Sequence, residues 1–268
     1  MIPEPYSAFI VPEWGVLRWW SVLLTVGVLA GARVARWQAG RLGLDTRHAL
    51  PLLVAAVAAG ILGARMYYLV FEWERRFADE PELAWLIWEG GVALHGALVG
   101  GLLAMAVYAR LARLDFVRWI DATALGLPLG IGVARWGDYF NQQSFGVPTD
   151  LPWALAIEEQ YRPLLYLEQN GFHPTFLYES VWALVVFGAA VTVAKLGRGL
   201  RPGDVALGVL AAYSVGRFWI ESIRADPIIV GEGLRLAMIV SAGIATVGIG
   251  SMVLRRWPGR MFHVKHSG

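Results

Sequence analysis

Residues 50–71 read LPLLVAAVAAGILGARMYYLVF, an apolar run with a single charged side chain, Arg65. A helix needs about 20 apolar residues to cross the ~30 Å hydrocarbon core of a bilayer. This stretch therefore predicts a transmembrane helix. Windows of similar composition recur six times, at about 16–37, 91–110, 118–137, 176–195, 203–222 and 234–254.

The composition of the whole chain also indicates a membrane protein. Hydrophobic residues make up 57% of the 268 residues and charged residues 16%, whereas soluble domains are about 45–50% apolar and about 25% charged. We predict an all-α polytopic membrane protein with seven transmembrane helices in a single transmembrane domain, 1–268. The absence of cysteine excludes disulfides, thiolate metal sites and a cysteine nucleophile. We expect no metal, since there are five histidines and two lie in the tail.

The distribution of basic residues predicts the orientation. With the N-terminus outside and the C-terminus in the cytoplasm, 14 of the 23 Lys and Arg residues fall in inner segments and six in outer ones. The positive-inside rule favours this arrangement. The basic stretches, including a tail at about 255–268, then face anionic lipid, and we expect no nucleic-acid partner. Residues 1–13 lack a basic region and a cleavage site, so we expect the first span to remain in the mature protein.

One outer connection is unusually long. Residues 138–175 carry four prolines with acidic and aromatic residues between them, and show no obvious helix or strand. Connections of this length are usually functional or disordered, and the aromatic content argues against disorder. We expect an outer-face loop or head segment here.

Five ionisable residues within or at the ends of the spans fall on the predicted outer half of the membrane. They are His95, Arg135, Asp138, Arg217 and Glu221. A charge at mid-bilayer costs roughly 2.5–3.5 kcal/mol, so such residues indicate a functional site. An ion channel would need polar residues along a whole pore, and the inner half of these spans offers almost none.

The sixth span concentrates polar residues on one helical face. Tyr213, Arg217, Glu221 and Arg224 follow spacings of 4, 4 and 3. One guanidinium group can donate two parallel hydrogen bonds to a phosphate, so this face suits an anionic headgroup. The alternative is an internal Arg217–Glu221 ion pair, with Arg224 extending to the interface.

Three further stretches carry weaker signals. Arg135, Asp138 and Asn141 share a face if the fourth helix persists, or form a charged cap. His95 lies among glycines and either belongs to the site or hydrogen-bonds to another helix. For Glu179, in HPTFLYE, an interfacial cap with a helix-pairing carboxylate is favoured over catalysis.

Taken together, the motifs resemble the prolipoprotein diacylglyceryl transferase family of bacterial inner membranes. They are GGVALHGALVG, ARWGDYFNQQSFG, HPTFLYE and YSVGRFWIESIR, in the family's order over roughly 15–255. The resemblance implies transfer of a diacylglyceryl group from phosphatidylglycerol to the lipobox cysteine of a prolipoprotein signal peptide, without a cofactor. It implies His95, Arg135 and Arg217 as catalytic residues. It implies Tyr213, Glu221, Arg224, Asp138, Asn141, Gly96 and Gly146 as substrate-binding residues.

Four positions depart from the family's usual residues. This chain has Trp20 where the family usually has tyrosine, Ala97 in place of glycine, Asp138 in place of asparagine and Gln143 in place of glutamate. A carboxylate beside a phosphate site repels the phosphate unless a cation neutralises it, so Asp138 requires Arg135 as its partner. The alternative function is that of a divergent paralogue that binds or transports phospholipid without catalysis.

Overall fold

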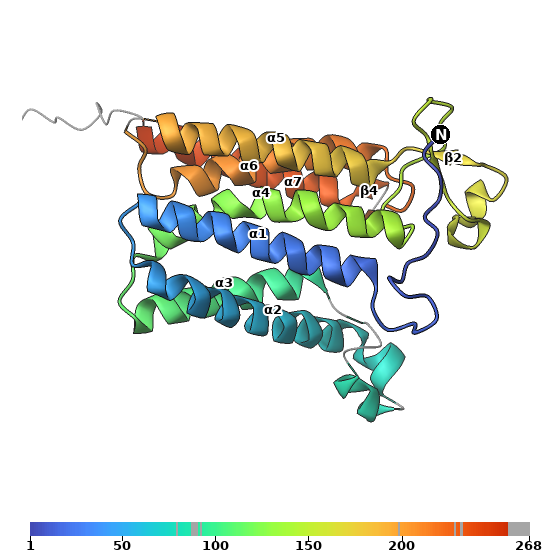
Figure 1. The fold of residues 1–268 in the computed structure, drawn as a ribbon, viewed down its shortest axis with the longest axis horizontal. Coiled ribbons are helices and arrows are strands. Elements are labelled where there is room, and N and C mark those ends of the chain that lie inside the picture. The colour runs from blue at the N-terminus through green and yellow to red at the C-terminus, as the bar shows by residue number, and fades with distance from the viewer. Residues whose placement is uncertain are drawn as a thin grey trace, which may run out of the picture. The chain divides into compact units, whose positions relative to one another are not determined.

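The computed structural model describes residues 1–78, 80–86, 91, 93–197, 199–227, 229–230 and 233–256. Within these residues the chain is mostly helical (Figure 1). The long helices are α1 (Trp19–Arg41), α2 (Ala49–Glu72), α3 (Leu94–Leu111), α4 (Phe116–Phe140), α5 (Thr175–Leu196), α6 (Asp204–Ser222) and α7 (Leu236–Arg256). Each of the seven predicted windows overlaps one of them.

Four helical segments are long and apolar enough to cross a membrane. They are Thr46–Glu72, which includes the short helix η1 (Thr46–His48), together with Phe116–Phe140, Thr175–Leu196 and Leu236–Arg256. A shorter apolar helical segment covers His95–Leu111. The predicted basic tail at about 255–268 lies mostly outside the described residues.

The chain forms two compact units. Unit 1 comprises Met1–Val34 and Thr123–Gly268, and unit 2 comprises Ala35–Ala122. Helices α1 and α4 each contribute to both units, because the unit boundaries fall within them.

In unit 2, α2 and α3 pack backbone against backbone. A side chain added at Gly96 would collide with the Gly63 carbonyl, and one added at Gly100 would collide with the Ala59 carbonyl. Glycine permits this close approach because it has no Cβ. At the other end of these helices, Leu52, Met105 and Trp119 form a core with Ala39 and Ala122. Helix α1 runs past its predicted end at residue 37, and Ala39 in its last turn is buried in this core.

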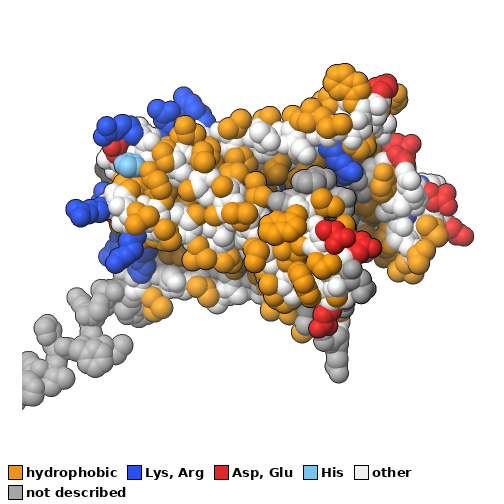
Figure 2. Space-filling model, turned by 90° about the horizontal axis from the view of Figure 1, so that it is seen from below, with side chains coloured by type: hydrophobic (Ala, Val, Ile, Leu, Met, Phe, Trp, Pro, Cys, Tyr) orange, Lys and Arg blue, Asp and Glu red, His pale blue; other side chains and the backbone are white. Residues whose placement is uncertain are grey.

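The outer surface of the helices is apolar. Exposed hydrophobic side chains follow α2 and α3, among them Val54, Ile61, Leu62, Leu98 and Leu102. On the face shown in Figure 2, hydrophobic side chains are spread over much of the surface. A large exposed apolar surface of this kind is expected of a protein that contacts lipid.

The buried guanidinium of Arg65, in α2, binds the backbone of the segment that precedes α3. Arg65 donates hydrogen bonds to the carbonyls of Leu83, Ala84 and Gly91, at 2.6, 3.0 and 3.0 Å. Leu83 and Ala84 belong to the short helix η3 (Pro81–Trp85). The guanidinium also lies over the Phe77 ring, 5.4 Å from its centroid. Arg65 thus orders the chain that leads to α3.

In unit 1, α1 and α4 also meet at glycines. An added Cβ at Gly126 would collide with the Gly31 carbonyl, and one at Gly27 would lie 2.5 Å from the Gly130 carbonyl oxygen. Helices α5, α6 and α7 lie side by side (Figure 1). Two side chains of α5 donate hydrogen bonds to the backbone of the neighbouring helices α4 and α6. Ser180 Oγ donates to the Gly132 carbonyl at 2.7 Å, and Trp182 Nε1 donates to the Ala212 carbonyl at 3.0 Å.

The predicted head segment contains more regular structure than its sequence indicates. Strands β1 (Leu155–Ala156) and β2 (Gly171–Phe172) pair antiparallel. Around them, Phe145, Ile157 and Phe176 form a buried cluster with residues of both strands. Each strand is two residues long, which is too short to leave an alternating pattern in the sequence. A second hairpin, β3 (Ile229–Val230) with β4 (Leu234–Arg235), precedes α7.

The contact between α1 and α4 predicts the effect of Gly126→Val. The new side chain has no room beside Gly31, so we expect unfolding in detergent to require roughly 1–3 kcal/mol less free energy. The melting temperature should fall by roughly 5–10 °C. Gly188→Ala is the control, since an added Cβ there meets nothing within 4 Å and should leave the melting temperature nearly unchanged. Equal melting temperatures for the two variants would contradict the close packing.

The contacts of Arg65 predict the effect of Arg65→Lys. An ammonium group cannot reproduce the fork of donors, so residues 81–86 should lose about 2 kcal/mol of local stability. Hydrogen exchange of this segment, followed by mass spectrometry, should accelerate about 30-fold. Arg76→Lys, which alters an exposed arginine bonded to the Tyr68 hydroxyl, should leave the exchange unchanged.

Candidate functional site

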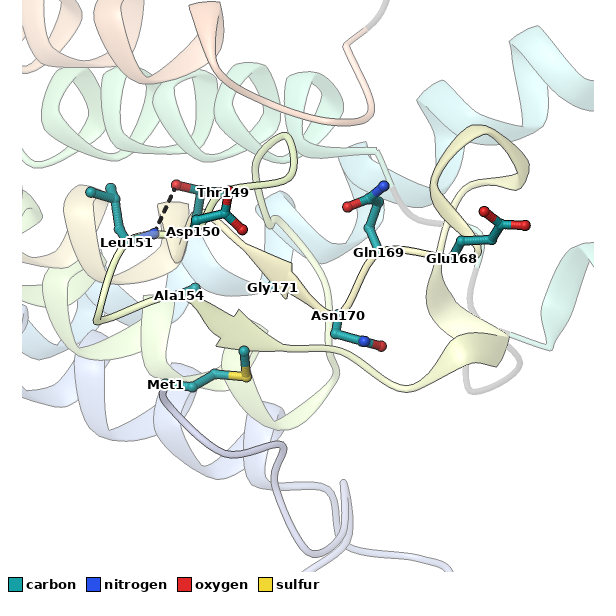
Figure 3. Close-up of a pocket in the computed structure, with 9 residues that line it drawn as sticks. All are labelled: Met1, Thr149, Asp150, Leu151, Ala154, Glu168, Gln169, Asn170 and Gly171. Carbon is teal, nitrogen blue, oxygen red and sulfur yellow. Dashed lines mark hydrogen bonds between the residues drawn. The ribbon is translucent and has the colours of Figure 1, made fainter.

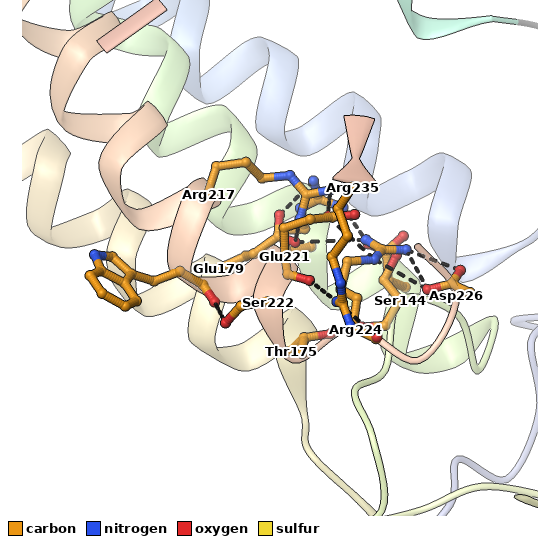
Figure 4. A network of polar contacts seen from close by, with 12 residues as sticks. Ser144, Thr175, Glu179, Arg217, Glu221, Ser222, Arg224, Asp226 and Arg235 are labelled. Atoms are coloured by element: carbon orange, nitrogen blue, oxygen red, sulfur yellow. Dashed lines mark hydrogen bonds and ion pairs between the residues drawn. The ribbon is translucent and has the colours of Figure 1, made fainter. Parts of the chain in front are cut away.

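A network of arginines and carboxylates joins the ends of three helices in unit 1. Figure 4 shows much of it, with side chains from α5, α6 and β4 converging. Its arginines are Arg135, Arg217, Arg224 and Arg235, and its carboxylates are Asp138, Glu179, Glu221 and Asp226. Charged side chains within apolar helices are stable only when they are paired, so the network accounts for every one of these groups.

The residues of α6 meet as their spacing predicts. Arg217 Nη2 lies 2.7 Å from Glu221 Oε2, an i,i+4 pair. Arg224 Nε lies 3.8 Å from the same oxygen, although α6 ends at Ser222 and Arg224 follows it. Tyr213, one turn before Arg217, interacts electrostatically with Arg135, Glu179 and Arg217. The Arg217–Glu221 ion pair is therefore present and is part of a larger cluster.

Helix α4 contributes Arg135 and Asp138. Arg135 Nη1 donates a hydrogen bond to Asp138 Oδ2 at 2.7 Å. The helix continues through Phe140, three residues beyond the predicted end, where Phe140 stacks on Trp19 with ring centroids 5.0 Å apart. Asn141 follows the helix directly. The cation that the sequence requires beside Asp138 is thus in place.

Glu179, from α5, lies at the centre of the network. Its Oε2 is 2.6 Å from Arg135 Nη2, and its Oε1 accepts a hydrogen bond of 2.9 Å from Arg217 Nη1. Arg224 Nη1 lies 3.9 Å from Oε1. The prediction for Glu179 identified a helix-pairing carboxylate but missed its central position. The sequence gives no signal that three arginines from two separate segments converge on it.

The two central carboxylates are buried and the arginines are more accessible. The exposed fractions of the side chains are 1% for Glu179 and 3% for Glu221, against 24% for Arg135, 20% for Arg217 and 13% for Arg224. A guanidinium has five N–H groups, so one that contacts two carboxylates keeps donors for a further anion. The arrangement can bind a phosphate oxygen at the accessible edges of the arginines.

Some buried acceptors of the site are left without an aligned hydrogen bond. Within the described residues these include Glu179 Oε2, Glu221 Oε2 and Asn141 Oδ1. The two glutamate oxygens contact guanidinium nitrogens, but as ion pairs without hydrogen-bond geometry. These oxygens can accept a hydrogen bond from a donor such as a hydroxyl group.

Backbone pairing connects the head segment to the end of α6. Gly146 forms an antiparallel bridge with Arg224. Val147 N donates to the Ile223 carbonyl at 2.8 Å, and Ala225 N donates to the Phe145 carbonyl at 3.2 Å. A Cβ at Gly146 would lie 2.7 Å from both His173 Cβ and the Ile223 carbonyl oxygen. Gly146 therefore lets the head approach the site closely.

Arg235 secures the other side of the site and was missed by the sequence analysis. From β4, its Nη1 donates to the carbonyls of Glu221 and, at 3.3 Å, Arg224. Basic groups at the C-terminal end of a helix satisfy its unpaired carbonyls. Arg235 thus fixes the segment between α6 and Asp226.

His95 and Gly96 belong to unit 2. The His95 ring is exposed and stacks on Tyr67, with centroids 5.9 Å apart. Gly96 is buried against Gly63. The structure thus brings Arg135, Asp138, Tyr213, Arg217, Glu221 and Arg224 into one network, and the participation of His95 and Gly96 stays a prediction.

The other unusual positions have defined surroundings. Trp20 packs on Gly137 of α4, where an added Cβ would lie 2.8 Å from the indole Cδ1. Ala97 is half-buried in α3, near Gly60 of α2. The Gln143 side chain is exposed, and its backbone N donates to the Asp138 carbonyl at 2.9 Å.

A separate cavity of about 300 Å³ lies in the head (Figure 3). Polar residues line much of it, including Thr149, Asp150, Glu168, Gln169 and Asn170. It is lined by no arginine of the network and by none of the predicted site residues.

Fold and site together define a multi-pass helical membrane protein with a buried arginine–carboxylate site. Comparison with known proteins agrees. The family whose model matches residues 8–254 is described as prolipoprotein diacylglyceryl transferase, and the chain belongs to this family.

Its relatives are bacterial. Proteins named phosphatidylglycerol–prolipoprotein diacylglyceryl transferase are 43% identical in Gloeobacter violaceus, with 91% of both chains covered, and 39% identical in Synechococcus sp. (strain CC9902), with 87% of both covered. The protein of that name in Prochlorococcus marinus (strain MIT 9215) is 36% identical, with 95% of this chain and 94% of the relative covered.

Proposed function

We propose that the protein transfers the diacylglyceryl group of phosphatidylglycerol to the lipobox cysteine of a prolipoprotein, forming a thioether. The names of the relatives support the two substrates, at 36–43% identity over most of the chain. The observation that carries the proposal is the pair Arg135 and Arg217, held by one buried carboxylate with their edges accessible. Two fixed guanidiniums suit the phosphate of the lipid donor.

We place the protein in the bacterial inner membrane as a single transmembrane domain, with seven crossings, the N-terminus outside and the C-terminus in the cytoplasm. The positions of charges in unit 1 support this orientation. In unit 1, Arg255 and Arg256 pair with Asp204 at the start of α6, while the arginine network lies at its end. A basic inner end then puts the network and the head, 138–175, at the outer face.

The reaction is a substitution at carbon. The cysteine sulfur forms a bond to the glyceryl carbon, the bond from that carbon to the phosphate oxygen breaks, and glycerol phosphate leaves. Negative charge develops on the leaving phosphate, where Arg135 and Arg217 stabilise it. Because the arginines are already fixed by carboxylates, little reorganisation is needed when this charge appears.

The thiol must lose its proton before it attacks. A free cysteine has a pKa of about 8.5, so most of it is protonated at neutral pH. We assign to His95 the role of accepting this proton or orienting the thiol. The proton leaves with the buffer or with the product phosphate, and no metal or cofactor takes part.

The remaining predicted residues position the lipid headgroup. Tyr213, Glu221, Arg224 and Asp138 belong to the network of the two arginines, and Asn141 directly follows α4. The buried oxygens Glu221 Oε2 and Asn141 Oδ1, which lack a hydrogen bond, can accept hydrogen bonds from glycerol hydroxyls. Gly146 keeps the head against this site, and Gly96 lets α3 approach α2 beside His95. Membrane lipids reach the site laterally, and the head guides the signal peptide.

The direct test is transfer of labelled diacylglyceryl from phosphatidylglycerol vesicles to a lipobox peptide by the purified protein. Arg217→Ala should slow transfer by about 10²–10³, the usual effect of removing one donor that stabilises developing charge. Arg217→Lys keeps the charge but loses the paired donors, so its transfer rate should lie between those of wild type and Arg217→Ala.

The control is Arg47→Ala, which removes an arginine that is 89% exposed and pairs with Asp45. It should transfer at the wild-type rate. An Arg217→Ala variant as fast as wild type would refute the phosphate role. Lipid bound in a 1:1 ratio by wild type, with no transfer, would favour a non-catalytic lipid-binding protein.

The role of His95 is tested by His95→Ala. Loss of a proton acceptor should slow transfer by about 10²–10⁴, and imidazole in the buffer should restore part of the rate. The other described histidine of unit 2, His48, is hydrogen-bonded to the Tyr108 hydroxyl at 2.9 Å. His48→Ala should keep the wild-type rate and show no response to imidazole. A slow His95→Ala variant that imidazole leaves unchanged would point to packing instead of proton transfer.

A further inference from the structure

Glu179 is the carboxylate that connects the arginines of separate helices. Arg135 comes from α4 and Arg217 from α6, and both contact Glu179, at 2.6 and 2.9 Å. Asp138 pairs with Arg135, three residues earlier on the same helix. Glu221 pairs with Arg217 and Arg224 of its own segment. Among the described carboxylates, Glu179 bridges α4 and α6.

The bridge has a mechanical consequence. Two guanidiniums on long, flexible side chains repel each other and would move apart without a shared anion. Glu179 is 1% exposed, and its neighbour Ser180 is hydrogen-bonded to α4, so the carboxylate cannot follow a displaced arginine. The buried carboxylate therefore fixes the distance between the two arginines.

The bridge also has an electrostatic consequence. The described network contains four arginines and four carboxylates, so its formal charge is zero, although Arg235 bonds to backbone carbonyls and not to a carboxylate. A phosphate is then held by oriented donors and not by excess positive charge. The product, a phosphate monoester, carries more negative charge than the diester substrate. A neutral network limits how tightly that product remains bound.

We propose that Glu179 is a positioning residue with these two effects, an inference that rests on the proposed transfer reaction. Its negative charge holds Arg135 and Arg217 in the geometry that stabilises the leaving phosphate. The same charge weakens the binding of glycerol phosphate, so that product leaves. Glu179 acts through the arginines and does not itself touch the reacting atoms.

The test is Glu179→Gln, which keeps the shape of the side chain and removes its charge. We expect kcat to fall about 100-fold, the effect of misplacing groups that stabilise the transition state. The KM for phosphatidylglycerol should not rise. Inhibition by glycerol phosphate should become at least about threefold tighter, because one unit charge about 6 Å away, on the other side of a guanidinium, changes anion affinity by roughly that factor even at the dielectric constant of water.

Two other variants separate charge from bridging. Asp138→Asn removes one negative charge from the network but leaves the bridge, so it should bind glycerol phosphate more tightly with a much smaller fall in kcat. Asp204→Asn removes a carboxylate of 2% exposure that pairs with Arg255 and Arg256 at the other end of α6. It should change neither quantity.

Glycerol phosphate binding is also measured without turnover, from the rise in melting temperature that it causes. A Glu179→Gln variant with kcat within threefold of wild type would overturn the proposal. So would a slow variant whose affinity for glycerol phosphate is unchanged, since that result indicates a structural role. If wild type transfers no lipid, the proposed function fails, and the binding comparison still decides whether Glu179 sets anion affinity.

Glu179→Asp covers the case in which the glutamine variant does not fold. Aspartate keeps the charge but is one methylene shorter, so it cannot contact both arginines. We expect a reduced kcat with wild-type affinity for glycerol phosphate. A wild-type kcat in Glu179→Asp would show that the bridge is dispensable and would overturn the proposal.

Discussion

The pairing of buried charges among apolar helices is the constraint on which the site depends. Glu179 is almost inaccessible, and an isolated carboxylate there would be strongly unfavourable. Its contacts with Arg135 and Arg217 compensate for the burial of all three groups. The same pairing ties α4, α5 and α6 together at one level. The stability of this end of the helices and the geometry of the arginines therefore rest on the same ion pairs.

Close packing of the helices brings charged side chains of different helices within the distance of an ion pair. Gly126 and Gly130 of α4 contact Gly31 and Gly27 of α1 backbone to backbone, and Gly216 lies under the Trp182 indole. A side chain added at these positions would collide with the facing helix and force the helices apart. The head then closes the end of the site through backbone pairing at Gly146, which needs no side chain at all. Small residues here serve the geometry of charged residues that lie elsewhere on the same helices.

Much of the fold and part of the site were predictable from the sequence. Hydrophobic windows place all seven helices because length and composition are local properties. The face shared by Arg217, Glu221 and Arg224 is local as well, since it follows from helical spacing. The central position of Glu179 was not predictable, because it depends on how α5 packs between α4 and α6. Arg65 and Arg235 were also missed as organising residues. Both donate hydrogen bonds to backbone carbonyls. Every residue has such a carbonyl, so the sequence does not indicate which ones act as acceptors.

The order of the two units along the chain bears on how the protein is made. Unit 2 is one continuous stretch, whereas unit 1 is divided into a short early part and a long late part. During synthesis unit 2 is complete before α5 emerges from the ribosome. Arg135 and Asp138 precede α5 in the chain, so both are synthesised before Glu179, the other partner of Arg135. The arginine network closes only after α6 and the β3–β4 hairpin have been inserted. The residues of the network are thus complete in the chain only after unit 2 and most of the helices have been synthesised.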